Sequence, residues 1–191
     1  MTAPNKTPTY RQTDGDSPHL TKADWVRAAL ERYEQPLLRY AARITGDVER
    51  ARDVVQFTFM RLWEAERGKV DGHLTGWLYT VCRNRARDVR RKERRMNPLG
   101  DTQAAVYPSP KPGPDAAAVG NETHAIVMEV IDGLSDSHQE AFRLRFDDDL
   151  TYREIAEIMG VSLGKVSKLV TTALEALRAR LRAETDLAQE V

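Results

Sequence analysis

The chain has 191 residues, which is enough for one ordinary domain or two small ones. Its 29 basic and 29 acidic residues cancel, whereas a protein that binds DNA unaided usually carries a basic surplus, so weak duplex binding by the isolated chain is expected. The single cysteine, Cys82, excludes a disulfide framework, and the lack of a long apolar run or a signal-peptide pattern favours a cytoplasmic protein without a membrane span.

The N-terminal part of the chain predicts a tail followed by a helix. Residues 1–20 combine prolines, glycine and polar side chains that have little to bury, and a disordered tail is expected there. Thr21 followed by Asp24 can cap a helix, and apolar residues then recur at helical spacing. Pro36 should kink this helix or divide it in two.

A second amphipathic helix is predicted from residue 48 to about residue 66, after a turn at Gly46–Asp47. Its core positions recur at helical spacing and are Ala51, Val54, Val55, Thr58, Leu62 and Trp63. Gly68 and Gly72 then interrupt the pattern, so a loop is expected before the next helix.

The helix predicted from Trp77 to Arg95 separates its side chains by kind at about 100° per residue. One face is apolar and includes Cys82, and a nearly opposite face carries Arg83, Arg87, Arg90 and Arg94. A third flank carries Trp77, Asn84 and Arg91, which could read bases. From Arg83 to Arg95 the net charge is +6, so the rest of the chain sums to −6.

Guanidinium groups match phosphate and base edges better than ammonium groups do, so nucleic acid is the leading hypothesis for this helix. The alternative is a solvated basic helix end whose side-chain stems lie along the edge of the core.

Composition changes from Met96 to about Gly120, where five prolines and an alanine run predict a flexible linker over residues 96–122. Helical periodicity resumes near Thr123, and a further helix is expected over 135–146. The acidic run 147–149 should close that helix, and a cation site is the rarer explanation for such a run.

Residues 150–181 predict two helices joined by a tight turn. Thr151 and Glu154 form a capping box, Gly160 can adopt the left-handed conformation that ends the first helix, and Ser162 can cap the second. This pattern is typical of a helix-turn-helix, whose second helix reads DNA. Two core helices joined by a glycine turn are the alternative.

Together these stretches resemble the extracytoplasmic-function (ECF) group of bacterial RNA polymerase sigma factors. The phrases GDVERARDVVQFTFMRLWE, GWLYTVCRNRARDVRR and LTYREIAEIMGVSLGKVSKLVTTALEALR occur in the order and spacing of that family. The resemblance implies an all-α fold of two small helical domains, region 2 over 21–95 and region 4 over 123–184, joined by the proline-rich linker and followed by a short tail, 185–191.

The resemblance also implies the function and the partners. The chain should bind core RNA polymerase, at the clamp of the largest subunit and the flap of the second, and direct promoter-specific initiation by opening the minus-10 element and reading the minus-35 element. By this resemblance the clamp contacts are Asp53, Val55, Gln56, Phe57 and Phe59, with Phe57 standing where an acidic residue is usual. An anti-sigma factor that holds the two domains shut is a further partner that the length of the linker allows.

The DNA contacts follow from the same resemblance. In region 2 the resemblance implies that the loop 68–75, with Lys69 and His73, and the helix residues Trp77, Asn84 and Arg87 open the minus-10 element and hold a flipped base. The charged faces of the same helix add Arg83, Arg90, Arg91 and Arg94 as candidate DNA contacts. In region 4 they are Arg153, Lys165, Ser167, Lys168, Thr171 and Thr172. Leu169 stands where a basic residue is common, so direct readout should rely on Lys165, Ser167 and Lys168.

Other classes of function leave part of the sequence unexplained. A helix-turn-helix regulator acting without polymerase would usually dimerise, and the chain offers no heptad seam. A general nucleic-acid interaction module would explain the basic helix but not the helix-turn-helix. No enzymatic activity, metal or other cofactor is expected, because the four histidines are scattered and Cys82 has no placed base.

Overall fold

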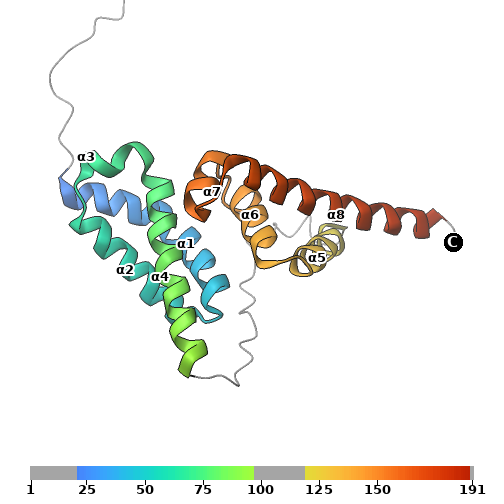
Figure 1. The fold of residues 1–191 in the computed structure, drawn as a ribbon, viewed down its shortest axis with the longest axis horizontal. Coiled ribbons are helices and arrows are strands. Elements are labelled where there is room, and N and C mark those ends of the chain that lie inside the picture. The colour runs from blue at the N-terminus through green and yellow to red at the C-terminus, as the bar shows by residue number, and fades with distance from the viewer. Residues whose placement is uncertain (1–20, 97–118, 190–191) are drawn as a thin grey trace, which may run out of the picture.

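The computed structural model describes residues 21–96 and 119–189, with side chains over 21–96 and 125–184. The tail predicted at 1–20 and the linker residues 97–118 lie outside the described residues, as do 190–191. Every regular element in the described ranges is helical (Figure 1), which confirms the all-α prediction. None of the described helices is long and apolar enough to cross a bilayer.

The N-terminal domain is a bundle of three long helices, α1 (Lys22–Thr45), α2 (Val48–Glu64) and α4 (Leu74–Met96), which pack against one another (Figure 1). The predicted cap of α1 is present, because the Thr21 side chain accepts a hydrogen bond from the Asp24 amide. Pro36 lies inside α1 without dividing it.

The turn between α1 and α2 follows from two residues. Gly46 ends α1 with φ 74°, a left-handed conformation that costs glycine little, and Asp47 caps α2 by accepting a hydrogen bond from the Arg50 amide at 2.8 Å. The prediction of a turn at these two residues is confirmed.

Cys82 lies on the buried face of α4, as predicted for a small core residue. Its Sγ lies 3.9 Å from the Leu37 carbonyl oxygen of α1. Burial raises the pKa of the thiol to about 12, although a hydrogen bond with Thr58 acts in the opposite direction.

The C-terminal domain consists of α5 (Val119–Asp132), α6 (Asp136–Phe146), α7 (Tyr152–Met159) and α8 (Leu163–Gln189). Helix α5 begins four residues before the point where periodicity was expected to resume. Helix α8 is a single helix to Gln189, beyond the 184 boundary expected for the domain (Figure 1).

The turn between α7 and α8 has the predicted helix-turn-helix geometry. Thr151 and Glu154 form both hydrogen bonds of a capping box, and Gly160 ends α7 with φ 67°. The Ser162 hydroxyl accepts a hydrogen bond from the Lys165 amide at 3.2 Å. Val166 is fully buried and Leu169 is nearly so, which fixes α8 against α7.

The two domains share one apolar core. A single cluster of buried side chains includes Tyr79 and Ala86 of α4 together with Leu150, Ile155 and Met159 of the C-terminal domain. Helix α4 packs against α7, so the C-terminal domain lies against the helix that carries the arginine-rich stretch from Arg83 to Arg95 (Figure 1). This docking could not be anticipated from helical periodicity alone.

Candidate nucleic-acid interface

The C-terminal domain covers one end of the basic face of α4 and leaves the rest accessible to solvent. Arg87 and Arg94 are exposed and Arg90 is partly exposed, whereas Arg83 is 7% exposed. The expectation that Arg83 stands with the others on an open cationic face is therefore wrong for this conformation. The helical wheel of α4 placed Arg83 correctly on that side, but α6 and α7 cover it there.

Arg83 is held by a carboxylate and a carbonyl of the C-terminal domain. Its Nε and Nη2 donate to the two oxygens of Glu140 at 2.7 and 3.0 Å, and its Nη1 donates to the Met159 carbonyl at 3.3 Å. Paired N–H groups facing both carboxylate oxygens form the strongest geometry available to an arginine side chain. Burial opposes the charge of Arg83, but the hydrogen bond to Glu140, the negative charge of Glu140 and the nearby Tyr40 together outweigh it and raise the pKa of the guanidinium.

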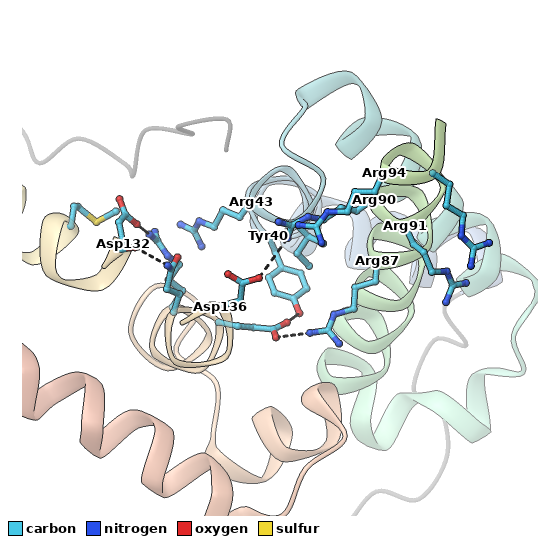
Figure 2. Close-up of a pocket in the computed structure, with 14 residues that line it drawn as sticks. Tyr40, Arg43, Arg87, Arg90, Arg91, Arg94, Asp132 and Asp136 are labelled. Atoms are coloured by element: carbon cyan, nitrogen blue, oxygen red, sulfur yellow. Dashed lines mark hydrogen bonds and ion pairs between the residues drawn. The ribbon is translucent and has the colours of Figure 1, made fainter. Parts of the chain in front are cut away.

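Glu140 accepts from two further residues of the N-terminal domain. The Tyr40 hydroxyl donates to Oε1 at 2.7 Å, and Arg87 donates to Oε2 at 3.3 Å (Figure 2). Burial alone would raise the pKa of Glu140, but hydrogen bonds from Arg83 and Tyr40 hold it below its usual range. Burial, reinforced by the adjacent Glu140 charge, raises the pKa of Tyr40 well above its ordinary value.

Further charged pairs surround this contact. Arg43 of α1 pairs with Asp147 at 2.8 Å, and Arg90 lies 3.9 Å from Asp136 at an exposed edge. A cavity of about 800 Å³ lies between the domains, and half of the residues that line it are arginines (Figure 2). The residues that line the cavity include Tyr40, Arg43, Arg87, Arg90, Arg94 and Glu140.

The third flank of α4 is accessible. Asn84 and Arg91 are exposed, Trp77 is partly buried, and Arg91 pairs with Asp88 at 2.8 Å. The side chains expected to read a base therefore remain open to solvent, while part of the arginine face expected to contact phosphate is covered.

The segment 68–75, expected to be a loop, is helical over most of its length. It contains α3 (Arg67–Val70), the 3₁₀ turn η1 (Asp71–His73) and the first residues of α4. Asp71 organises it by accepting from the Trp25 indole at 3.0 Å and from Arg67 at 3.2 Å. The glycines interrupt the helical spacing of apolar residues, which is why a loop was expected. The hydrogen bonds of Asp71 stabilise a helical backbone there instead.

Lys69 and His73, the candidate DNA contacts of this segment, are both exposed. Lys69 lies 3.0 Å from Glu66, an exposed pair of small energetic weight. Both side chains can therefore reorient toward a ligand.

The outer face of α2 differs from the expected polymerase-binding set. Asp53 and Gln56 are exposed and Phe57 is partly buried beneath Arg85, whose guanidinium lies 4.8 Å from the ring centroid. Val55 and Phe59 are 6% and 7% exposed and pack in the core, so Asp53 and Gln56 are the fully accessible members of the expected set.

Two apolar residues on the outer face of α2 were missed as binding candidates. Met60 is 56% exposed and Trp63 is 50% exposed, although Trp63 was expected to face the core. Met60 lies four residues after Gln56 and Trp63 lies three residues after Met60, so all three share one side of the helix. This helical spacing from Asp53 and Gln56 could have identified Met60 and Trp63 as surface candidates from the sequence.

The first turns of α8 carry the remaining DNA candidates. Lys165, Ser167, Lys168 and Thr171 are exposed, Thr172 is partly exposed, and Arg153 of α7 is exposed. The buried side chains Val166, Leu169 and Val170 hold the opposite face of the helix. Leu169 thus serves packing, and its neighbours remain available for readout.

Comparison with known proteins gives two family matches and several relatives. The model for Sigma-70 region 2 matches residues 29–96, and that for Sigma-70 region 4 matches residues 130–179. The ECF RNA polymerase sigma factor SigL of Mycobacterium tuberculosis is 30% identical over 163 residues, covering 84% of this chain and 91% of the relative. RNA polymerase sigma factor YlaC of Bacillus subtilis is 30% identical over 151 residues, covering 75% of this chain and 84% of the relative.

Solved structures share the fold. The sigma factor RpoE of Bartonella quintana, in complex with the anti-sigma factor NepR, aligns with a TM-score of 0.61 at 23% identity, covering 82% of this chain and 96% of that one. CnrH in complex with the cytosolic domain of CnrY aligns with a TM-score of 0.54 at 20% identity, covering 83% and 88%.

Proposed function

The chain belongs to the ECF group of the sigma-70 family and is an alternative sigma factor that directs transcription initiation with RNA polymerase, and we propose that it does so through three separate exposed faces. The outer face of α2 binds the polymerase, the exposed flank of α4 with the segment 68–75 binds the minus-10 element, and α8 reads the minus-35 element. The observation that carries this assignment is the exposure of Asn84 and Arg91 on α4 together with Lys165 and Lys168 on α8.

The proposed polymerase contact is an apolar strip with a polar edge. Met60 and Trp63 supply exposed apolar area on α2, and Asp53 and Gln56 supply the polar edge. Aromatic residues and methionine are enriched at protein interfaces, whereas such side chains are otherwise usually buried. We place the clamp of the largest subunit against this strip and the flap of the second subunit against the C-terminal domain.

The minus-10 element is opened and then held. Separating DNA costs about 1.4 kcal/mol for each base-pair step, so four or five steps require about 6 to 7 kcal/mol. One base stacked on a protein side chain returns about 1 to 3 kcal/mol. A chain with no net charge cannot supply the difference alone, so polymerase contacts are needed to hold the register and the open strands.

Position and sequence are read by different residues. Arg87, Arg90 and Arg94 hold the phosphate backbone, whereas Asn84 and the segment 68–75 contact a base. On α8, Lys165, Ser167 and Lys168 approach base edges in the major groove and Arg153 of α7 approaches the backbone. Because these partners are the polymerase and the chromosome, the protein acts in the cytoplasm.

Reconstitution with bacterial core polymerase tests this function. Purified chain should associate with the core enzyme and produce transcripts whose mapped starts define two sequence elements at a fixed spacing. Specific binding of the same DNA with equal affinity in the absence of core polymerase would instead favour a helix-turn-helix regulator, and no association with core would contradict the proposal.

A further inference from the structure

We propose that the cavity between the two domains is a binding site for a nucleoside polyphosphate. Arginines from α1, α4 and α6 would hold the phosphates, and uncharged side chains of the same cavity would hold the base. The site goes beyond the promoter contacts proposed above, because α1 and α6 carry none of them.

The cavity has the size and the charge expected of a site for a phosphorylated ligand. Its volume of about 800 Å³ lies within the range of sites that hold small molecules and cofactors. Of the 14 residues that line it, seven are arginines and three carry carboxylates. Because such sites are usually lined mainly by apolar side chains, this surplus of guanidinium groups indicates a ligand with several negative charges.

The positive charge of the lining is only partly neutralised by the protein. Among the described residues, Arg94 and Arg95 have no acidic partner. Arg90 extends from α4 toward the C-terminal domain, but it lies 3.9 Å from Asp136, whose side chain is 87% exposed (Figure 2). A long and exposed ion pair contributes little, so a phosphate group can replace it.

Arg43 of α1 and Arg143 of α6 bring guanidinium groups to the cavity from outside α4. Their side chains are 17% and 14% exposed, and each pairs with an aspartate, Arg43 with Asp147 at 2.8 Å and Arg143 with Asp132 at 2.6 Å. A guanidinium has five N–H donors, so one carboxylate contact leaves donors for a phosphate. These pairs therefore hold the two side chains in position for a ligand.

Three uncharged side chains of the cavity suit a nucleobase. Ile44 and Met128 are partly buried and supply apolar area, and a methionine thioether packs well against aromatic rings. The Gln139 amide nitrogen donates to the carbonyls of Asp132 and Leu134 at 3.1 and 2.8 Å, which fixes the orientation of the amide. Its oxygen is then the atom that can accept a hydrogen bond from a ligand. Adenine has an exocyclic amine for this contact, whereas uracil has none.

Isothermal titration calorimetry of the free full-length chain with ATP, UTP and inorganic tripolyphosphate tests the site. ATP should bind with one molecule per chain, and about tenfold more tightly than UTP or tripolyphosphate, because only ATP combines the phosphates with the amine that Gln139 accepts. Equal affinity for ATP and tripolyphosphate would overturn the assignment to a nucleoside polyphosphate.

Substitutions outside α4 locate the site. Arg43→Gln and Arg143→Gln should each weaken ATP binding about tenfold, since each removes a charged hydrogen-bond donor. Arg143→Lys, which keeps the charge but loses the planar fork, should weaken it less. Arg145→Gln is the matched control, because Arg145 lies on the same helix, pairs with Asp149 and does not line the cavity.

Circular dichroism with thermal unfolding checks that each variant is folded, and small-angle X-ray scattering checks that its domains stay docked. If Arg43→Gln separates the domains, Arg143→Gln carries the test, because Arg143 pairs within its own domain. Absence of ATP binding by the folded wild-type chain would overturn the proposal. Equal losses in Arg143→Gln and Arg145→Gln would also overturn it, since they would indicate only general attraction of a polyanion. Polymerase and DNA are absent from these titrations, so a failure here leaves the proposed sigma activity unaffected.

Discussion

Arg83 and Glu140 are 57 residues apart in the chain, yet their side chains meet in two parallel contacts of 2.7 and 3.0 Å across the domain boundary. Neither residue finds an equivalent charged partner among the described residues of its own domain. The pair therefore couples the stability of the two domains.

Replacing Arg83 with Ala should lower the free energy of unfolding by about 1.5 to 3 kcal/mol, because Glu140 loses its main donor while Tyr40 and Arg87 remain. Urea denaturation followed by circular dichroism measures the change. In a double-mutant cycle, adding Glu140→Ala should cost little more than either single change. Strict additivity of the two losses would show that the pair contributes nothing as a pair.

Charge reversal at Arg87 should weaken transcription from all cognate promoters by a similar factor, because a phosphate contact carries no sequence information. Replacing Asn84 with Ala should instead change which minus-10 bases are accepted. Both effects are measured by transcription of a randomised minus-10 library with holoenzyme. Arg27→Glu is the control, since Arg27 is 70% exposed near the start of α1 and lies outside the proposed faces. An unchanged base preference in Asn84→Ala would remove the reading role.

Replacing Lys165 with Ala should weaken binding to the minus-35 element and lower its discrimination between cognate and mutated sequences, because Lys165 is proposed to approach base edges. Each lost phosphate contact lowers the slope of log affinity against log salt by about 1, whereas loss of a base contact lowers discrimination by about 1 to 3 kcal/mol. Titrating holoenzyme with cognate and mutated minus-35 duplexes at several salt concentrations distinguishes the two roles. Arg182→Ala, at an exposed site farther along α8, provides the comparison. Equal losses in both variants would mean that only general charge matters.

Replacing Trp63 with Ala should reduce affinity for core polymerase about tenfold, because interface tryptophans often contribute more than 1 kcal/mol. Trp63 is 50% exposed, so the free energy of unfolding should change little.

Val55→Ala should have the opposite effect, lowering stability through lost core packing while leaving the surface intact. Fluorescence titration with core enzyme and urea denaturation measure the two effects. Leu30→Ala, 38% exposed on α1, controls for loss of exposed apolar area. Full affinity in Trp63→Ala would move the polymerase contact elsewhere.

The stability of the docked chain should rise as the pH falls from about 7 to 5. Burial raises the pKa of Asp148 to about 6, opposed by a hydrogen bond with Tyr79 and the charge of Arg43. A carboxyl whose pKa is higher in the folded chain takes up a proton there first, so its contribution is present at low pH and is lost as pH rises through 6. Glu140, whose pKa is lowered, opposes this only near and below its usual value of 4.5.

Asp148→Asn should remove this pH dependence, amounting to about 1 kcal/mol of unfolding free energy between pH 7 and pH 5. Urea denaturation at intermediate pH values measures it. Asp149→Asn is the control, because the Asp149 side chain is 96% exposed. Parallel pH profiles for wild type and Asp148→Asn would contradict the assignment.

Local features of the fold were predictable because their causes are local. Thr21, Gly46 and the capping box of Thr151 with Glu154 act within one helix turn, and each is found as expected. The helix-turn-helix follows from the same rules.

Features set by distant contacts were not predictable. The burial of Arg83 depends on Glu140, which the helical wheel of α4 cannot include. The helical course of 68–75 depends on Asp71 meeting Trp25, 46 residues earlier in the chain. The exposure of Trp63 could not be inferred from its apolar character, because interface residues and core residues obey the same helical period.

The burial of Cys82 has a practical consequence, since it is the sole thiol in the sequence and its pKa is raised to about 12. Thiolate is the reactive form, so maleimide or disulfide reagents should spare this residue in the native protein. Surface cysteines introduced one at a time can then carry fluorophores without removal of the native residue. Any slow modification of Cys82 itself would report the rate at which the interior beneath α4 opens to solvent.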